Sequence, residues 1–306
     1  MQAAYYEAFG GPENVQIGER PKPSPDADHV LVRTRAAAVG IWDVGIMSGR
    51  LGQVPLPRIP GAEVAGTVEI GAGGFRAGDR VFCSLWDSLG GGFAEIAAAR
   101  VDRTALIPDR VDFPEAAGLV ISAGTAYEGL VDRARLQAAE TVLITAASGG
   151  VGTAAVQIAR NAGARVVAVT SARNHRYVRD LGAEVAVDYH DSDFVEQLRR
   201  AAPDGFDVLF DGTGNDVRDQ VLGLIRRGGR GIFIIGGAPP APEGVEFQSF
   251  AATVDAPRLE AIANLASGGK LRMPIETEFP LERAREAMEQ VGAHHTVGRV
   301  VLRIGS

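Results

Sequence analysis

Apolar and polar residues follow two different rhythms along the chain. Up to about residue 110, short alternating runs such as "HVLVRTRAAAV", "EVAGTVEIG" and "RVFCSL" are separated by glycine and proline turns, which is typical of a compact, irregular β fold. From about Asp112, continuous apolar runs such as "TVLITA", "RVVAVT" and "FDVLFD" alternate with segments of helical spacing. Strands that are apolar throughout are covered on both faces, so this part predicts a doubly wound parallel sheet.

Helices are expected between these strands, from Gly150 onward, over residues 174–181, around 194–201 and around 217–225. The segment "AIANLASGGKL" predicts a further helix with a glycine stop. The tail "RVVLRI" predicts a strand that returns to the first part of the chain. The pattern therefore predicts an α/β protein, with a doubly wound Rossmann sheet beside a β-rich domain.

The segment "VLITAASGGVGTAAVQIAR" places its glycines where a strand turns into a helix, which is the context of a dinucleotide fingerprint. The pattern departs from G-x-G-x-x-G, because Ala147 stands first while Gly149 and Gly152 stand second and third. Gly149 lets the backbone approach a pyrophosphate, and Gly152 lets the helix pack closely on the sheet. The alternative is a glycine turn that binds nothing; its place among several βα units favours the dinucleotide site.

The end of the next strand, in "VVAVTSARNHR", lacks the carboxylate that binds the ribose 2′-hydroxyl of NAD. Ser171 and Arg173 offer a hydroxyl and a cation there instead, which suits a 2′-phosphate. The alternative is that Arg173 is a solvated loop charge. The missing acid and the arginine together favour NADPH.

The composition of the chain limits which classes of partner and which cellular compartment we expect. A net charge of -7 argues against nucleic acid or an anionic membrane as the main partner, and no apolar run is long enough to span a bilayer. The start of the chain lacks the pattern of a secretory signal. Cys83 is the only cysteine, which excludes an intrachain disulfide and fits a reducing compartment. We expect a cytoplasmic protein that acts on a small molecule.

Several longer segments, among them "IPGAEVAGTVEIG", "GGFAEIAAA", "AASGGVGTAAVQIAR" and "GRVVLRI", resemble the medium-chain dehydrogenase/reductase superfamily. Within it they are most similar to the zinc-free quinone oxidoreductase (zeta-crystallin-like) group, and the resemblance covers nearly the whole chain. It implies a GroES-like domain over residues 1–119 and 269–306, and a Rossmann domain over residues 120–268. It also implies NADPH as the cofactor.

The resemblance further implies which positions lie along the cofactor. They are Thr125 near the nicotinamide; Ser148, Gly149, Gly150 and Val151 at the pyrophosphate; Ser171, Arg173 and Tyr189 at the 2′-phosphate; Thr213, Ile235 and Gly236 at strand ends; and Arg299 from the tail. Structural roles are the alternative: Tyr189 as a strand cap, Gly236 as a turn and Thr125 as a packed helix residue.

The zinc ligands of the superfamily's alcohol dehydrogenases have no counterpart in this chain. Those enzymes have Gly-His-Glu where Gly61, Ala62 and Glu63 stand here, and the earlier ligand segment, "AAAVGIWDVGIMSG", contains neither Cys nor His. No ligand spacing relates the five histidines, His29, His175, His190, His294 and His295. We expect catalysis without a metal.

Without a metal to polarise an alcohol oxygen, the expected reaction is hydride transfer from NADPH to a quinone or an α,β-unsaturated carbonyl. Asp43, Ser48 and Arg50 form the most suggestive local polar set. Asp43 keeps the acid of the family pattern A-V-N-x-x-D, whereas Gly40 replaces its asparagine. Asp43 is the candidate catalytic residue, but a role in tying a loop together is favoured over general-acid catalysis. For the whole chain, the alternative is a non-catalytic NADPH-binding protein with a structural or regulatory role.

The run "VEFQS" after "IIGGAPPAPEG" alternates apolar and polar residues and predicts a strand at the edge of the Rossmann sheet. An open edge exposes unpaired N–H and C=O groups, and the same strand of a second copy would satisfy them. A homodimer is therefore expected. The alternative is a monomer whose edge is kept soluble by Glu246 and the nearby prolines.

Overall fold

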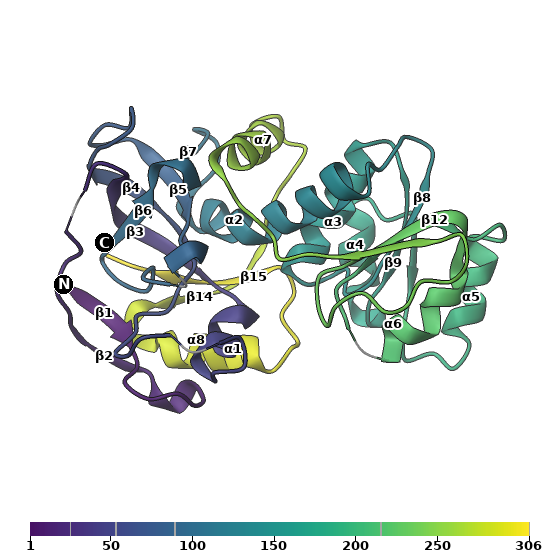
Figure 1. Ribbon diagram of the computed structural model, residues 1–306, viewed down its shortest axis with the longest axis horizontal. Coiled ribbons are helices and arrows are strands. Elements are labelled where there is room, and N and C mark those ends of the chain that lie inside the picture. Colours follow the sequence, from purple (N-terminus) through teal and green to yellow (C-terminus); the bar gives the residue numbers. More distant parts are fainter. Residues whose placement is uncertain (25, 53, 89, 215, 306) are drawn as a thin grey trace. The chain divides into compact units, whose positions relative to one another are not determined.

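The computed structural model describes residues 1–24, 26–52, 54–88, 90–214 and 216–305 (Figure 1). The chain divides into two compact units, residues 1–121 with 254–306, and residues 122–253.

The second boundary lies earlier than the one predicted after residue 268. The reason is helix α7 (Ala256–Ser267), which belongs to the first unit because it packs against strand β7 (Thr104–Leu106).

The first unit is built mainly on antiparallel β structure, with one parallel pair of strands. Its described strands form a seven-stranded sheet, in the order β14-β15-β3-β4-β5-β7 with β6 paired to β3, and a separate pair β1-β2. Besides β7, the strands are β1 (Gln2–Tyr5), β2 (Gln16–Glu19), β3 (His29–Val39), β4 (Glu63–Ile70), β5 (Arg80–Ser84), β6 (Ile96–Arg100), β14 (Ile275–Pro280) and β15 (Arg299–Arg303). Besides α7, the helices are α1 (Ile41–Met47), α8 (Ala284–Gly292) and the 3-10 turns η1 (Pro12–Asn14), η2 (Trp86–Ser88), η3 (Val101–Arg103) and η7 (Leu281–Arg283).

The tail of the chain completes this sheet. Strand β15 pairs antiparallel with β3, with Val300 opposite Val39 and Val301 opposite Ala38. Ala38 also faces Glu63 of β4, so the ends of three strands meet at this point. The return of the tail to the first domain is therefore confirmed.

The second unit contains a parallel sheet. Its described strands number six, in the order β10-β9-β8-β11-β12-β13, and every adjacent pair is parallel. This is the Rossmann order 3-2-1-4-5-6, which confirms the predicted fold class. The strands are β8 (Thr141–Ile144), β9 (Arg165–Val169), β10 (Val185–Val187), β11 (Phe206–Asp211), β12 (Ile225–Phe233) and β13 (Glu246–Ser249). The helices are α3 (Gly150–Asn161), α4 (His175–Leu181), α5 (Phe194–Ala201), α6 (Asp216–Val221), the π-helical turn η4 (Glu128–Arg133), and the 3-10 turns η5 (Ala172–Asn174) and η6 (Leu222–Leu224); helix α2 (Phe113–Tyr127) leads from the first unit into the second.

Helices cover both faces of this sheet (Figure 1). Leu209 of β11 belongs to an apolar cluster with Leu198 of α5 and Val221 of α6. Phe210 follows Leu209 in β11. A methyl on Gly129 of η4 would lie 2.5 Å from the Phe210 ring. Neighbouring strand residues point to opposite faces, so α5 and α6 lie on one face and η4 on the other. Burial of each such side chain contributes about 1.5–3 kcal/mol to stability.

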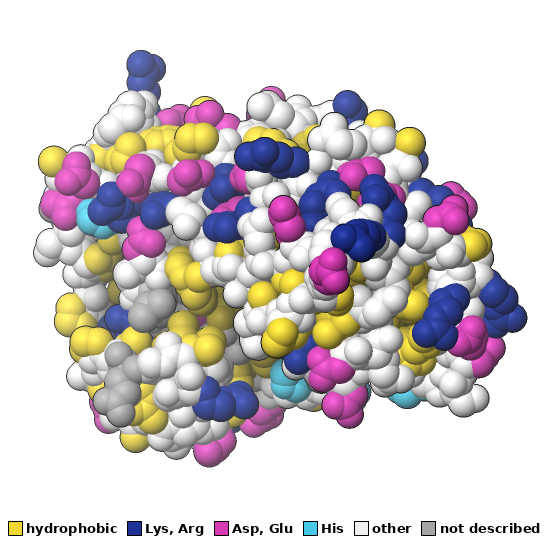
Figure 2. Space-filling model, turned by 45° about the vertical axis from the view of Figure 1, so that its right-hand side comes forward, with side chains coloured by type: hydrophobic (Ala, Val, Ile, Leu, Met, Phe, Trp, Pro, Cys, Tyr) yellow, Lys and Arg dark blue, Asp and Glu magenta, His cyan; other side chains and the backbone are white. Residues whose placement is uncertain are grey.

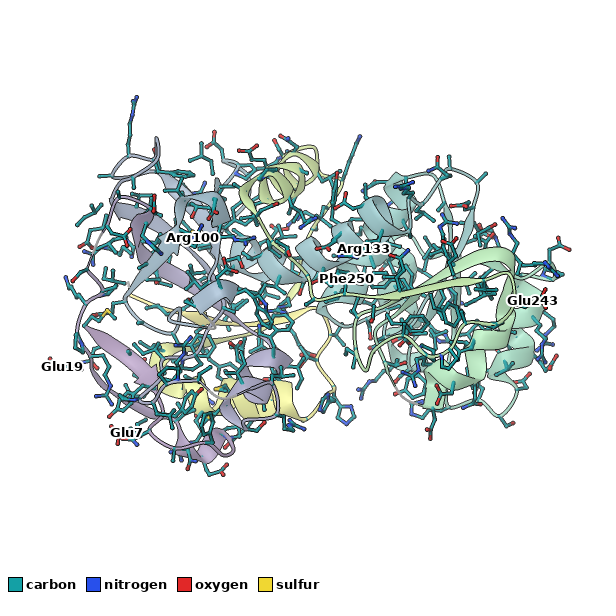
Figure 3. All side chains as sticks on the ribbon, in the orientation of Figure 1. Glu7, Glu19, Arg100, Arg133, Glu243 and Phe250 are labelled. Atoms are coloured by element: carbon teal, nitrogen blue, oxygen red, sulfur yellow. The ribbon has the colours of Figure 1, made fainter. Side chains whose placement is uncertain are left out.

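Strand β13 lies at the edge of the sheet, beside β12. Phe247 packs edge-on against Phe233, with ring centroids 4.9 Å apart. The segment after the strand is tied to η4, because the Arg133 guanidinium lies 4.5 Å from the centroid of the Phe250 ring (Figure 3). These contacts occupy one side of the strand and the segment that follows it.

Basic and acidic side chains are interspersed over the face shown in Figure 2. Within the described residues, no helix combines the length and the apolar character needed to cross a bilayer.

Candidate functional site

Most of the predicted cofactor residues of the second unit follow the carboxyl ends of its strands. They are Ser148, Gly149, Gly150 and Val151 after β8, Ser171 and Arg173 after β9, Tyr189 after β10, Thr213 after β11, and Ile235 and Gly236 after β12. Because the strands are parallel, these ends meet at one edge of the sheet. The strand order reverses between β8 and β11, and ligands of such sheets bind at that switch point.

The two glycines of the fingerprint play different roles in the turn between β8 and α3. A Cβ on Gly152 would lie 2.2 Å from the Ala146 carbonyl oxygen and 2.6 Å from the Ala147 Cα, so the fold itself requires this glycine. A Cβ on Gly149 would meet only the Ala146 oxygen, at 3.5 Å, and its backbone has an ordinary φ of -74°. The space above Gly149 is therefore left clear for a group from outside the chain.

The start of α3 offers hydrogen-bond donors to such a group. Gly149 is the N-cap residue and has no side chain that could accept from the first-turn amides of α3. Those amides and the positive end of the helix dipole suit a phosphate. The turn therefore fits the pyrophosphate of a dinucleotide.

Ser148 lies at the same turn, but its hydroxyl is engaged inside the protein. The side chain is buried, and its Oγ accepts hydrogen bonds from Thr170 Oγ1 at 2.8 Å and Asn174 Nδ2 at 3.0 Å. Ser148 thereby ties the glycine turn to the loop after β9.

The structure brings Ser171 and Tyr189 together. The Ser171 hydroxyl donates to the Tyr189 hydroxyl at 3.3 Å, and Tyr189 is 38% exposed. Arg173 is exposed, and its guanidinium has no hydrogen-bond or ion-pair partner among the described residues. This loop pair therefore offers two hydroxyls and an uncompensated cation.

Two residues on either side of Tyr189, Asp188 and His190, were not predicted from the sequence. One oxygen of the buried Asp188 carboxylate accepts from the Ala172 amide at 3.0 Å, and the other accepts from His190 Nδ1 at 2.7 Å. Burial opposes ionisation of Asp188, but the hydrogen bonds from His190 and Ala172 outweigh it and lower its pKa. Asp188 thus links the loops after β9 and β10. An acid directly after the strand in "VAVDYH" was the available signal.

At the switch point, the buried Asp211 organises the loops after β8 and β11. Its carboxylate accepts from Thr145 Oγ1 at 2.6 Å, from Thr213 Oγ1 at 2.7 Å and from the Gly214 amide at 3.0 Å. The Thr213 hydroxyl is therefore engaged in a structural contact. Ile235 is 46% exposed, and a methyl on Gly214 would lie 2.8 Å from its Cγ2.

Two further predicted residues have mainly local surroundings. Gly236 has a φ of 74°, which favours glycine and shows its role in a turn. Thr125 is buried on α2, and its hydroxyl has no hydrogen bond to another described residue. The contact of Thr125 with the nicotinamide stays a prediction.

Arg299 belongs to the first unit, where it forms a buried cluster with acidic residues. Its guanidinium pairs with the fully buried Glu63 and lies 5.0 Å from the centroid of the Trp42 ring. The second Glu63 oxygen accepts from the Ile121 amide at 2.7 Å. This ion pair was not predicted from the sequence, and a contact of Arg299 with the cofactor stays a prediction.

Asp43 lies in the same unit and ties two loops together. Its two oxygens accept from the Gly40 amide at 2.8 Å and the Gly61 amide at 3.1 Å. Burial raises the pKa of Asp43 to about 6, and burial raises that of Glu63 to about 7, although Arg299 favours both carboxylates. Two buried acids thus share one arginine. The geometry supports the loop-tying role of Asp43, and its catalytic role stays a prediction.

The rest of the predicted polar set does not join Asp43 through the hydrogen bonds seen. Arg50 Nε donates to Ser48 Oγ at 3.0 Å, and Ser48 donates to the Gly45 carbonyl at 2.9 Å. Arg50 is exposed, whereas Asp43 is buried. Among the described residues, no group of three or more His, Cys, Asp or Glu side chains is arranged to hold a metal.

Comparisons with known proteins agree with this architecture. Residues 26–109 match the alcohol dehydrogenase GroES-like domain, and residues 150–263 match the zinc-binding dehydrogenase domain. A solved NAD-dependent alcohol dehydrogenase superposes with a TM-score of 0.90 at 28% identity, covering 100% of both chains.

Curated relatives are similar over nearly the whole chain. The rat quinone oxidoreductase is 32% identical, covering 95% of this chain and 94% of the relative. The chloroplastic NADPH-dependent alkenal/one oxidoreductase of Arabidopsis thaliana is 30% identical, covering 99% of this chain and 79% of the relative. The chain therefore belongs to the zeta-crystallin-like quinone oxidoreductase group of the medium-chain dehydrogenases/reductases, and it is an oxidoreductase.

Proposed function

We propose that this protein uses NADPH to transfer hydride to a quinone or an α,β-unsaturated carbonyl, without a metal. The main support for this proposal is the clear space above Gly149 at the start of α3. Gly149 follows the carboxyl end of β8, where the strand order of the Rossmann sheet reverses. The names of the quinone and alkenal/one oxidoreductase relatives support the acceptor class. The single, buried Cys83 is compatible with work in the reducing cytoplasm.

The residues of the second unit fit NADPH. Gly149 and the first-turn amides of α3 would hold the pyrophosphate, and Ser171, Arg173 and Tyr189 would hold the 2′-phosphate. When bound, the nicotinamide supplies the hydride, and the protein orients it against the acceptor. Quinones and enones delocalise the charge that hydride addition creates, so the reaction does not require a Lewis acid. Ala62, where zinc enzymes of the superfamily have a histidine, supports a metal-free site.

The test is NADPH consumption with a panel of quinones and enones, after elemental analysis of the purified protein. Turnover with at least one acceptor is expected in a preparation free of zinc, with no effect of chelators. NADPH binding without turnover on any acceptor would favour a non-catalytic role instead. Stoichiometric zinc in the active preparation would contradict the metal-free mechanism.

Arg173→Glu is expected to remove the preference for NADPH over NADH. A charge-assisted contact to a phosphate is worth about 1.5–3 kcal/mol, so NADPH affinity should fall about tenfold or more while NADH affinity changes little. Dissociation constants measured by titration calorimetry for both cofactors check this result. Arg199→Glu is the control, because that exposed arginine on α5 pairs with Glu196 and is not part of the loops after β9 and β10. Equal affinity of the wild type for the two cofactors would refute the preference.

We also propose a homodimer that pairs the free edge of β13 with its copy. Light scattering over a dilution series should give the dimer mass at micromolar concentration. Phe247→Pro should give a monomer, because proline cannot continue a ladder. Phe247→Ala is the control, since it removes the packing on Phe233 and keeps the backbone donor. A monomeric wild type would exclude the dimer. A dimer that survives Phe247→Pro would place the interface elsewhere.

A further inference from the structure

His190 follows Tyr189 in the loop after β10, next to the residues proposed to hold the 2′-phosphate. No role in cofactor binding has been given to His190 so far. Its ring stacks on that of Tyr189, with centroids 4.1 Å apart and planes at 32°. Tyr189 in turn accepts the hydrogen bond from Ser171. The imidazole is therefore one ring away from the two hydroxyls, and its side chain is 61% exposed.

Asp188 fixes the orientation of this ring. The carboxylate accepts from both the backbone amide and Nδ1 of His190, at 3.0 Å and 2.7 Å. An ionised carboxylate can only accept, so Nδ1 carries a hydrogen and Nε2 is the atom that gains or loses a proton. The other Asp188 oxygen holds the Ala172 amide, so the ring is fixed relative to the loop that carries Ser171 and Arg173.

Acidic as well as basic groups lie around the ring. Asp188 places a carboxylate between the two loops, and Asp191 follows in the same turn, with its amide bonded to the Asp188 carbonyl. From the neighbouring elements, Arg173 of η5 and Arg176 of α4 are cationic, and Arg176 faces Asp180. A bound 2′-phosphate would add up to two further negative charges near these groups. A second cation would offset the Asp188 carboxylate.

We propose that His190, oriented by Asp188, is a second cationic recognition group for the 2′-phosphate of the cofactor. The inference rests on the proposed NADPH function and specifies which residue adds pH dependence to it. Histidine is the side chain whose charge ordinarily changes between pH 5 and 8, so selectivity that depends on its cationic form falls as the pH rises. A protonated ring donates from Nε2 to the phosphate, while Asp188 acts as a positioning residue through Nδ1. Discrimination for the 2′-phosphate then depends on pH through this residue.

The experiment compares adenosine 2′,5′-bisphosphate with AMP, which lacks only the 2′-phosphate. Their dissociation constants are measured by calorimetry at pH 6 and pH 8 for the wild type, His190→Gln and Asp188→Asn. The ratio of the two constants gives the selectivity, and the titration of the phosphate itself cancels when variants are compared. His190→Gln should lose selectivity about five- to tenfold at pH 6 and less than about twofold at pH 8.

Asp188→Asn distinguishes positioning from general damage. The asparagine can still accept one hydrogen bond, but it no longer favours the imidazolium, so the pH at which His190-dependent selectivity is lost should move lower. His295→Gln, at an exposed histidine of the first unit, should change neither ratio.

Unchanged selectivity of His190→Gln at pH 6, or an equal loss at both pH values, overturns this inference and leaves the NADPH site standing. Arg173→Gln separates the two levels of the proposal. If it abolishes selectivity while His190→Gln does not, only the role of His190 is wrong. A wild type that binds both nucleotides equally at both pH values overturns the NADPH preference and this inference together.

Discussion

Replacement of Arg299 by methionine is expected to lower the free energy of unfolding of the first unit by about 3–5 kcal/mol at pH 8. Arg299 pairs with the fully buried Glu63, and the buried Asp43 carboxylate also depends on its charge. Methionine keeps much of the aliphatic packing but leaves two acids without a cation. The loss arises from those uncompensated charges rather than from a cavity.

The same substitution should cost much less at pH 5. Burial raises the pKa of Glu63 to about 7 and that of Asp43 to about 6, above the ordinary values. Between the ordinary carboxyl pKa values and these raised values, the folded state therefore binds more protons than the unfolded state. The stability that the two groups contribute falls as the pH rises through this range. Without Arg299 both pKa values rise further. At pH 5 the two carboxyls can then be neutral in the folded protein, which removes most of the penalty.

Urea unfolding followed by tryptophan fluorescence measures this effect in the first unit alone. The chain has 2 tryptophans, Trp42 and Trp86, and both lie in that unit, with ring centroids 6.3 Å apart. Glu63→Gln is the control, because it leaves Arg299 to compensate Asp43 and should cost less at pH 8. An Arg299→Met loss that is the same at pH 5 and pH 8 would show that packing, and not charge, holds the cluster.

The strands and helices could be predicted from the sequence where they depend on residues close together in the chain. The apolar runs gave the parallel strands, and the helix expected around 194–201 is α5 (Phe194–Ala201), because its polar and apolar positions repeat at helical spacing. The second domain boundary depended on what α7 packs against. That contact is with β7, more than a hundred residues earlier, and no local pattern records it.

The site was predictable where a backbone motif defines it, and less so where distant side chains meet. The glycine turn and the loop of Ser171 and Arg173 follow from the strand-to-helix order. The Glu63–Arg299 pair joins residues 236 positions apart, and the hydrogen bond from Thr145 to Asp211 joins residues 66 apart. Such contacts depend on strand order and register, which alternation alone does not define.

The two glycines of the fingerprint look alike in the sequence, but the structure predicts opposite outcomes for them. Gly152→Ala should destabilise the second unit by about 3 kcal/mol, because its Cβ would overlap the Ala146 and Ala147 backbone. Gly149→Ser should change stability by less than about 1 kcal/mol, because serine is a favourable N-cap residue and the backbone there is extended.

Gly149→Ser should nevertheless weaken NADPH binding about tenfold or more, because its side chain fills the clear space and its hydroxyl competes for the first-turn amides of α3. Circular dichroism during thermal unfolding gives the stability of each variant, and calorimetry gives the NADPH dissociation constant. Gly223→Ser is the matched control, since Gly223 is exposed and a Cβ there meets nothing within 4 Å. Wild-type affinity in Gly149→Ser would show that the pyrophosphate does not bind above this glycine. A large loss of stability in the same variant would show that the fold, and not a ligand, requires the glycine.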